Sequence, residues 1–83
     1  MQITFKLYAT LVDYLPAGTQ GHAVSVDIAG KTTVQQVIEQ FRIPEQLAFL
    51  VMLNGVYVAP EERLRTYLQA QDTLAVWPKV AGG

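Results

Sequence analysis

The sequence predicts a small α+β domain in which one main helix covers one face of a four- or five-stranded sheet. Three observations lead to this fold class. Strand-like segments occur at both ends of the chain, one amphipathic helical segment lies between them, and an Asn-Gly pair separates two apolar runs. Strands grouped around a single packed helix are typical of an α+β domain. With 83 residues, the chain has room for one such domain.

The first part of the chain contains two predicted strands. Residues 3–8 alternate apolar with polar side chains, which is typical of a strand with one buried face. Residues 24–28 alternate in the same way and predict a second strand, antiparallel to the first. Between them we expect a short helical turn, capped by Thr10 and ended by Pro16, and then a loop over residues 17–21.

The main helix is predicted over residues 34–41. Apolar side chains recur there at spacings i, i+3, i+4 and i+7, which places them on one helix face: Val34, Val37, Ile38 and Phe41. Thr33 or Thr32 can cap the N-terminus with its hydroxyl. We expect Pro44 to end the helix, because proline disfavours helical geometry in the residue before it.

The second half contains a predicted hairpin at Asn54-Gly55. This pair lies between apolar runs at 50–53 and 56–58, and a type I′ turn needs the positive φ angles that Asn and Gly tolerate. A last strand is expected at residues 74–77 and ends at Pro78.

Residues 60–71 are expected to be irregular or briefly helical, with Leu64 and Leu68 as buried anchors. A mixed run of charges within this segment is expected to be solvated: Glu61, Glu62, Arg63 and Arg65.

The hairpin register assigns side chains to the two faces of the sheet. A two-residue turn pairs Leu53 with Val56 and Met52 with Tyr57. The more aliphatic set is expected to face the helix: Val51, Leu53, Val56 and Val58. The other set is expected to point outward and to form a partner interface: Leu50, Met52, Tyr57 and Trp77. The alternative is that residues 60–71 fold over these side chains.

Composition excludes several classes of function. Six Lys and Arg against seven Asp and Glu give a net charge of −1, which argues against nucleic-acid binding. The absence of Cys excludes disulfides, Cys-ligated zinc and a Cys nucleophile, and His22 alone argues against a metal site. Residues 1–8 lack a signal-peptide core, and the longest apolar run, 47–53, is too short to cross a membrane. We therefore expect a cytoplasmic protein with no membrane partner.

The sequence closes with Gly82-Gly83, within an expected flexible tail at residues 79–83 that follows a folded domain at residues 1–78. Without Cβ atoms, a backbone can enter a channel that is too narrow for other residues. The terminal carboxylate would then reach the catalytic groups of another protein and be activated as a mixed anhydride with AMP. Because the chain has no Cys and one His, we expect it to be the substrate of this chemistry and not its catalyst.

Three segments and the order of the elements carry a resemblance to a known family. The segments are the opening FKLYATLVDYLP, the hairpin MLNGVYV and the ending QDTLAVWPKVAGG. Over essentially the whole chain they resemble the MoaD/ThiS sulfur carriers, which are ubiquitin-like β-grasp proteins with a mixed sheet. The chain departs from this family at Pro78-Lys79, where the molybdopterin branch usually has Pro-Pro, and at Gln71-Asp72, where the family has Gly-Asp.

The resemblance implies that Gly83 is the reactive end. An E1-like adenylyltransferase would adenylate its carboxylate with ATP and Mg²⁺, and a sulfur donor protein would convert it to a thiocarboxylate. The chain itself would bind no cofactor or metal. As the small subunit of molybdopterin synthase, it would insert a tail into the large subunit and give sulfur to a pterin precursor; the inserted residues would be Val80, Ala81 and Gly82. Trp77 and Tyr57 match family positions that lie before the tail and on the hairpin.

Other functions remain open at this point. The sulfur could serve a tungsten cofactor or, in the thiamine branch, the thiazole ring. A ubiquitin-like modifier would use the same activated Gly83 but pass it to a lysine. A β-grasp interaction module would need neither Gly82 nor Gly83.

Overall fold

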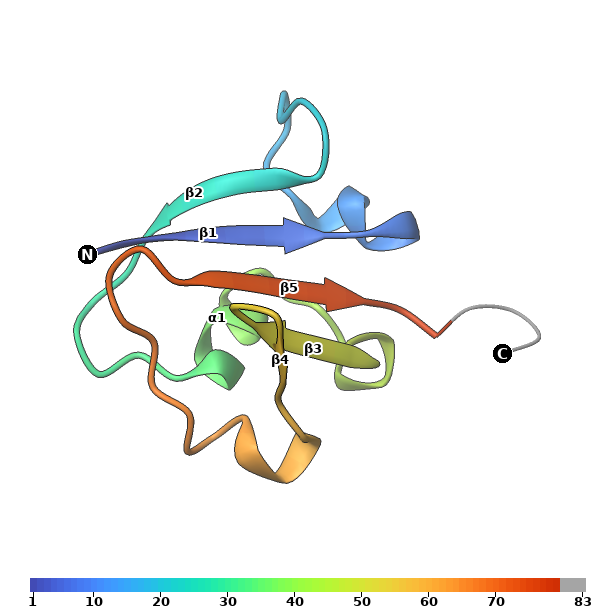
Figure 1. Ribbon diagram of the computed structural model, residues 1–83. Coiled ribbons are helices and arrows are strands. Elements are labelled where there is room, and N and C mark those ends of the chain that lie inside the picture. Colours follow the sequence, from blue (N-terminus) through green and yellow to red (C-terminus); the bar gives the residue numbers. More distant parts are fainter. Residues whose placement is uncertain (80–83) are drawn as a thin grey trace.

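The computed structural model describes residues 1–79, which form a five-stranded sheet packed on one α-helix (Figure 1). The strands are β1 (Gln2–Leu7), β2 (Ala23–Asp27), β3 (Leu50–Leu53), β4 (Val56–Tyr57) and β5 (Thr73–Trp77). The helix α1 covers Val34–Gln40, and the connections contain the 3₁₀ helices η1 (Ala9–Tyr14), η2 (Glu45–Leu47) and η3 (Pro60–Glu62). The expected tail residues Val80, Ala81, Gly82 and Gly83 lie outside the described residues.

The sheet is mixed, with the strand order β2-β1-β5-β3-β4. The first and last strands, β1 and β5, pair in parallel at its centre, and every other pairing is antiparallel. The predicted α+β fold is therefore confirmed, with five strands and the predicted antiparallel pair of β1 and β2.

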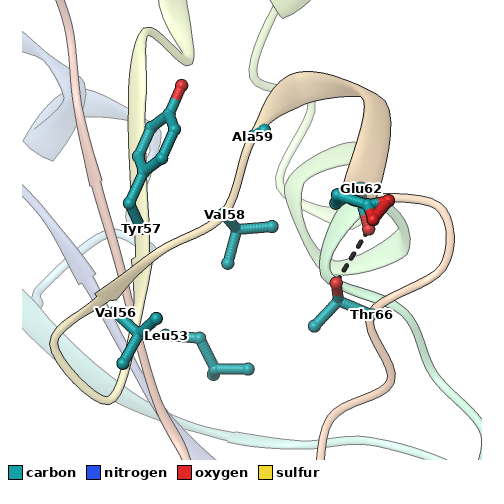
Figure 2. A pocket seen from close by; sticks show the side chains of 7 residues that line it. All are labelled: Leu53, Val56, Tyr57, Val58, Ala59, Glu62 and Thr66. Carbon is teal, nitrogen blue, oxygen red and sulfur yellow. Dashed lines mark hydrogen bonds between the residues drawn. The ribbon is translucent and has the colours of Figure 1, made fainter.

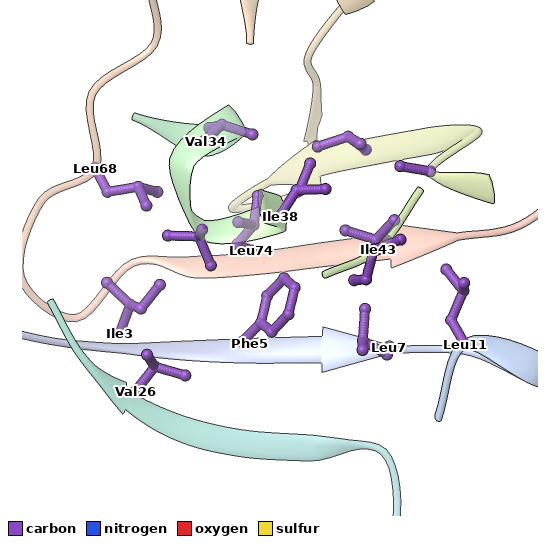
Figure 3. Packing of buried hydrophobic residues seen from close by; sticks show 14 of the residues in the cluster. Ile3, Phe5, Leu7, Leu11, Val26, Val34, Ile38, Ile43, Leu68 and Leu74 are labelled. Atoms are coloured by element: carbon purple, nitrogen blue, oxygen red, sulfur yellow. The ribbon is translucent and has the colours of Figure 1, made fainter. Parts of the chain in front are cut away.

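The core lies between the sheet and α1. Ile3, Phe5 and Leu7 point from β1 toward the helix (Figure 3) and are almost completely buried. The other strands and the helix add further buried side chains to the same cluster: Val34, Val37, Ile38, Val51, Leu74 and Val76. Burial of each such side chain contributes about 1.5–3 kcal/mol, so this layer supplies the main stabilisation of the domain.

Thr33 caps the N-terminus of α1, one of the two residues expected there. Its hydroxyl accepts a hydrogen bond from the Gln36 backbone N–H at 3.2 Å, and the Gln36 side chain accepts one from the Thr33 N–H at 2.8 Å. This reciprocal capping box satisfies two of the free N–H groups at the helix start.

The C-terminus of α1 differs from the prediction. Arg42 adopts a left-handed φ of 60°, and its N–H donates to the Glu39 carbonyl at 2.9 Å. The Ile43 N–H then donates to the Ile38 carbonyl at 3.2 Å, which completes a Schellman motif. The helix therefore ends before Pro44, and the expectation that Pro44 ends it was wrong.

Two other local predictions were wrong. Thr10 lies inside η1 and caps nothing, because the 3₁₀ helix begins at Ala9 and follows Tyr8, which makes no side-chain cap. Leu64 is 68% exposed, whereas Leu68 is buried as expected. The Leu68 N–H donates to the Thr32 carbonyl at 2.8 Å, so the chain is held against the start of α1 at Leu68 and not at Leu64.

The hairpin has the predicted type I′ geometry, with φ of 52° at Asn54 and 82° at Gly55. The predicted pairs, Met52 with Tyr57 and Leu53 with Val56, are both formed. Val56 is nevertheless 67% exposed, so its assignment to the helix-facing core was wrong.

Figure 2 shows the physical reason for this exposure. Val56 lines an open pocket of about 360 Å³ together with Leu53 and Val58, and Glu62 and Thr66 form the opposite wall. The short edge strand β4 thus has a hollow beside it, where Val56 meets solvent and not the helix.

Candidate functional site

The sheet face opposite α1, which we call the open face, collects the four residues predicted as a partner interface. Leu50 lies opposite Trp77, and Met52 lies between Tyr57 on β4 and Ala75 on β5. Tyr57 is 54% exposed, and the other three predicted residues are half-buried. On the far side of β5, Lys6 lies opposite Ala75 and adds one positive charge to this face.

Residues 60–71 do not fold over the open face, which was the alternative left by the sequence. Backbone hydrogen bonds tie this segment to the start of α1. The Val34 N–H donates to the Thr66 carbonyl at 2.9 Å, and the Gln35 N–H donates to the Arg63 carbonyl at 3.0 Å. The segment therefore packs on the helix side, and the apolar open face is left without a cover from it (Figure 1).

An aromatic stack holds Trp77 at the end of β5. Its ring is stacked on Tyr8 with a centroid distance of 4.4 Å and an interplanar angle of 2°. His22 packs on Tyr8 in turn, with a centroid distance of 4.6 Å. The alternation along β1 places Tyr8 outward with Lys6, but it does not reveal this stack. The chain therefore leaves the sheet beside an ordered group of rings.

Phe49 lies on the other side of the last strand and was missed by the sequence analysis. Its backbone N–H donates to the Trp77 carbonyl at 3.1 Å, and its side chain is 55% exposed. No periodic pattern marks this residue, because it precedes β3 in an irregular segment.

Arg63 is buried, with only 3% of its surface exposed, so the expectation of a solvated side chain was wrong. Its Nη1 donates to the Ala48 carbonyl at 2.9 Å and its Nη2 to the Phe49 carbonyl at 3.3 Å, while its Nε has no partner within residues 1–79. Burial lowers the pKa of the guanidinium, and the nearby Tyr57 and Glu45 raise it in part.

A pocket of about 330 Å³ connects Arg63 with the open face. Leu50 and Tyr57 belong to both, and Phe49 and Pro60 form further apolar walls. Glu45 and Gln46 also line this pocket. Aromatic and aliphatic walls with a few polar groups around a small pocket suit contact with another protein.

The described part of the chain offers neither a metal-binding cluster nor a membrane-spanning helix. Across residues 1–79, no group of three or more His, Cys, Asp or Glu side chains could hold a metal ion. No helix in this part of the chain is long and apolar enough to span a bilayer.

Solved structures of known proteins share the fold over the full length of this chain. SAMP1, a small archaeal modifier protein from Haloferax volcanii, has 26% identity and a TM-score of 0.72, with 100% of both chains covered. The thiamine biosynthesis protein ThiS from Geobacter metallireducens has 19% identity and a TM-score of 0.67, again with 100% of both chains covered.

A third similar structure is a complex of subunits 1 and 2 of molybdopterin-converting factor from Helicobacter pylori. It has 15% identity and a TM-score of 0.60, with 100% of both chains covered. Among curated proteins, none matches the chain. These structural neighbours confirm a ubiquitin-like β-grasp fold of the MoaD/ThiS type.

One family model matches nearly the entire sequence. It is described as Mut7-C ubiquitin and covers residues 1–82. The match extends through both central strands, the helix and the hairpin that forms part of the open face. This chain therefore belongs to the Mut7-C ubiquitin family.

Proposed function

We propose that this protein is a sulfur carrier whose Gly83 carboxylate is activated by an E1-like adenylyltransferase and converted to a thiocarboxylate. One observation carries the proposal. The central strand β5 ends at Trp77 on an apolar open face, and the sequence then continues through residues 78–81 to Gly82-Gly83. The open face provides a surface for docking, and the Gly-Gly sequence provides a slim end for chemistry in the partner.

The proposed chemistry proceeds in two stages. The Gly83 carboxylate attacks the α-phosphorus of ATP in the activating enzyme, which forms an acyl-adenylate and releases pyrophosphate. A persulfide on the sulfur donor protein then attacks the acyl carbon, and AMP leaves. A second thiol of the donor cleaves the S–S bond by forming a disulfide, which leaves the sulfur on Gly83. Every nucleophilic sulfur comes from the donor, because this chain contains no Cys.

We infer that the sulfur serves molybdopterin or a related tungsten or molybdenum cofactor. The similarity to a two-subunit molybdopterin-converting factor supports a partner that corresponds to the synthase large subunit. In that complex, we expect Val80, Ala81 and Gly82 to occupy the channel of the large subunit. The similarity to ThiS supports thiamine synthesis as the alternative destination. Because the activation uses ATP, the proposed site of action is the cytoplasm.

A second candidate is a protein modifier. The structure of SAMP1 shares 26% identity with this chain, which supports a role in which activated Gly83 is transferred to a lysine amine. The product would be an isopeptide with a target protein, and AMP would leave as before.

The deciding measurement is the intact mass of the purified chain after incubation with a candidate E1-like enzyme, ATP, Mg²⁺ and a persulfide donor. The carrier role predicts a mass gain that matches one oxygen replaced by sulfur. A variant that lacks Gly83 is the matched control and should show no gain. An unchanged mass with an enzyme that demonstrably releases pyrophosphate in the presence of this chain would contradict the carrier role.

Two further readouts separate the remaining functions. Conjugates of higher mass that retain this sequence would support the modifier. A variant without Gly82 and Gly83 that functions normally in complementation would refute both tail-dependent roles and leave an interaction module.

A further inference from the structure

The segment before β3 lies beside the point where the chain leaves the sheet. The Phe49 N–H bonds to the Trp77 carbonyl, and the Phe49 carbonyl accepts a hydrogen bond from Arg63. Both backbone groups of this exposed aromatic residue are therefore held. An aromatic side chain on a fixed backbone loses little conformational freedom when it binds a partner.

Arg63 connects three parts of the fold that are distant in sequence. Its carbonyl accepts from the Gln35 N–H at the start of α1, and its own N–H donates to the Pro60 carbonyl of η3 at 3.3 Å. Its guanidinium reaches the carbonyls of Ala48 and Phe49. The segment before β3 is thus held in place from the opposite side of the pocket.

The burial of Arg63 is poorly explained by stability alone. The ion pairs within residues 1–79 join Met1 to Asp27 and Arg65 to Glu62, and neither involves Arg63. Glu45 lines the same pocket but forms no ion pair with Arg63, and among the described residues the Arg63 Nε has no acceptor. A buried cation so incompletely paired is less favourable than an apolar side chain of similar volume. This unfavourable arrangement points to a geometric requirement for the group that Arg63 holds.

The place of Phe49 in the fold gives a reason for holding its segment in a fixed geometry. It lies next to Trp77, and Lys79 follows only Pro78 in the sequence. A protein that receives residues 80–83 must approach this end of β5. The pocket beside Phe49 has an apolar wall formed by Leu50, Tyr57 and Pro60. Its lining also includes three polar or charged residues, Glu45, Gln46 and Arg63.

We infer that Arg63 is a positioning residue that holds Phe49 at the end of β5, and that Phe49 contacts the activating enzyme, which inserts an apolar side chain into the adjacent pocket. This inference deepens the proposed function and rests on it. It adds a contact residue and its support, both outside the surface predicted from the sequence.

The positioning role can be tested without a partner by amide hydrogen exchange of the full chain. Arg63→Met should speed exchange at the Ala48 and Phe49 amides about tenfold or more, because the segment opens locally when its two carbonyl contacts are lost. Arg65→Met is the matched control, since it makes the same chemical change at an exposed arginine. Equal exchange at Phe49 in the two variants would overturn the positioning role.

The contact role is tested by the affinity for the E1-like enzyme that produces the mass shift described above. Phe49→Ala should weaken binding about tenfold or more, as expected for an aromatic contact, while the melting temperature stays within a few degrees. Leu64→Ala is the control at another exposed apolar side chain, which lies outside the pocket, and it should leave affinity unchanged.

A double variant tests whether Arg63 acts through Phe49. Phe49→Ala combined with Arg63→Met should bind no more weakly than Phe49→Ala alone, because the positioned ring is already absent. If the affinity losses of the two single variants multiply in the double variant, Arg63 does not act through Phe49. Where Arg63→Met fails to fold, Arg63→Lys replaces it and should retain part of the affinity, since an ammonium can donate to one of the two carbonyls.

The outcomes separate this inference from the proposed function. Normal binding by Phe49→Ala, with weak binding by Tyr57→Ala, would overturn the inference and leave the carrier role intact. Normal binding by both variants would remove the docking surface on which the two proposals depend.

Discussion

The two faces of the sheet are built from the same strands but differ in burial. Along β5, Leu74 and Val76 face α1 and are fully buried, whereas Ala75 and Trp77 lie on the open face. Because side chains alternate along a strand, neighbouring residues belong to different layers of the molecule. Substitutions one position apart should therefore separate stability from recognition.

The two faces also differ in the types of side chain that they carry. The covered face is mainly aliphatic and closes around Phe5, whose ring packs against Phe41 with a centroid distance of 4.6 Å. The open face carries Tyr57, Trp77 and the stacked Tyr8, which are residue types enriched in protein interfaces. Aliphatic packing maximises burial, whereas exposed aromatic rings provide large contact areas for a partner.

The largest effect is expected on the covered face. Phe5→Ala should lower the free energy of unfolding by about 3–5 kcal/mol, because a fully buried ring is replaced by a cavity. A domain of 83 residues has a total stability of about 4–12 kcal/mol, so this loss is a large share of the total. Urea denaturation measures the loss. A urea midpoint equal to that of the parent chain would show that Phe5 on the covered face does not contribute to stability.

On the open face, Tyr57→Ala should act on binding instead. We expect about a 30-fold loss of affinity for the activating enzyme, which corresponds to about 2 kcal/mol for an interface aromatic residue. The melting temperature should change little, because this side chain is half exposed. Isothermal titration calorimetry and a thermal melt measure both quantities. Unchanged affinity would remove Tyr57 from the docking surface.

A substitution in the hairpin turn at Asn54, which sets the register that assigns side chains to the two faces, should have a smaller effect on stability. The Asn54 side chain accepts a hydrogen bond from the Thr73 N–H at 2.8 Å and donates one to Asp72 at 2.9 Å. Asn54→Ala should lower stability by about 1–2 kcal/mol, since it removes both bonds and strains the positive φ. Asn54→Gly keeps the turn geometry and should be milder. Equal losses in the two variants, measured by denaturation, would show that backbone strain contributes nothing.

The smallest effect is expected at the helix cap on the covered side. Thr33→Ala should lower the free energy of unfolding by about 1 kcal/mol, because the capping hydrogen bond to Gln36 is lost. Affinity for the activating enzyme should stay unchanged, since α1 lies across the sheet from the open face. Thr33→Ser, which keeps the hydroxyl, is the control. A drop in affinity with Thr33→Ala would show that the two faces are coupled.

Much of the fold follows from short-range patterns. Alternation predicted β1 and β2, the four-position helical spacing predicted α1, and Asn54-Gly55 predicted the hairpin and its register. Each pattern reflects a local backbone geometry that nearby residues decide. The sequence left Thr33 and Thr32 as alternative caps of α1, and the structure shows that Thr33 is the cap.

The candidate site was predicted only in part. The hairpin register assembled Leu50, Met52 and Tyr57, because cross-strand partners can be deduced from a two-residue turn. The burial of Arg63 and the position of Phe49 could not be deduced. The guanidinium of Arg63 bonds to the carbonyls of Ala48 and Phe49, which are 15 and 14 positions away across an irregular connection, and no periodicity describes such contacts.

The sequence by itself therefore determined the strands, the helix, the hairpin and the alternation that separates a covered face from an open one. The tertiary structure decided which parts of those faces are filled. Val56 became exposed because a hollow lies beside the edge strand, and Arg63 became buried because three connections converge on it. Local geometry depends on neighbouring residues, whereas burial depends on what the rest of the chain places nearby.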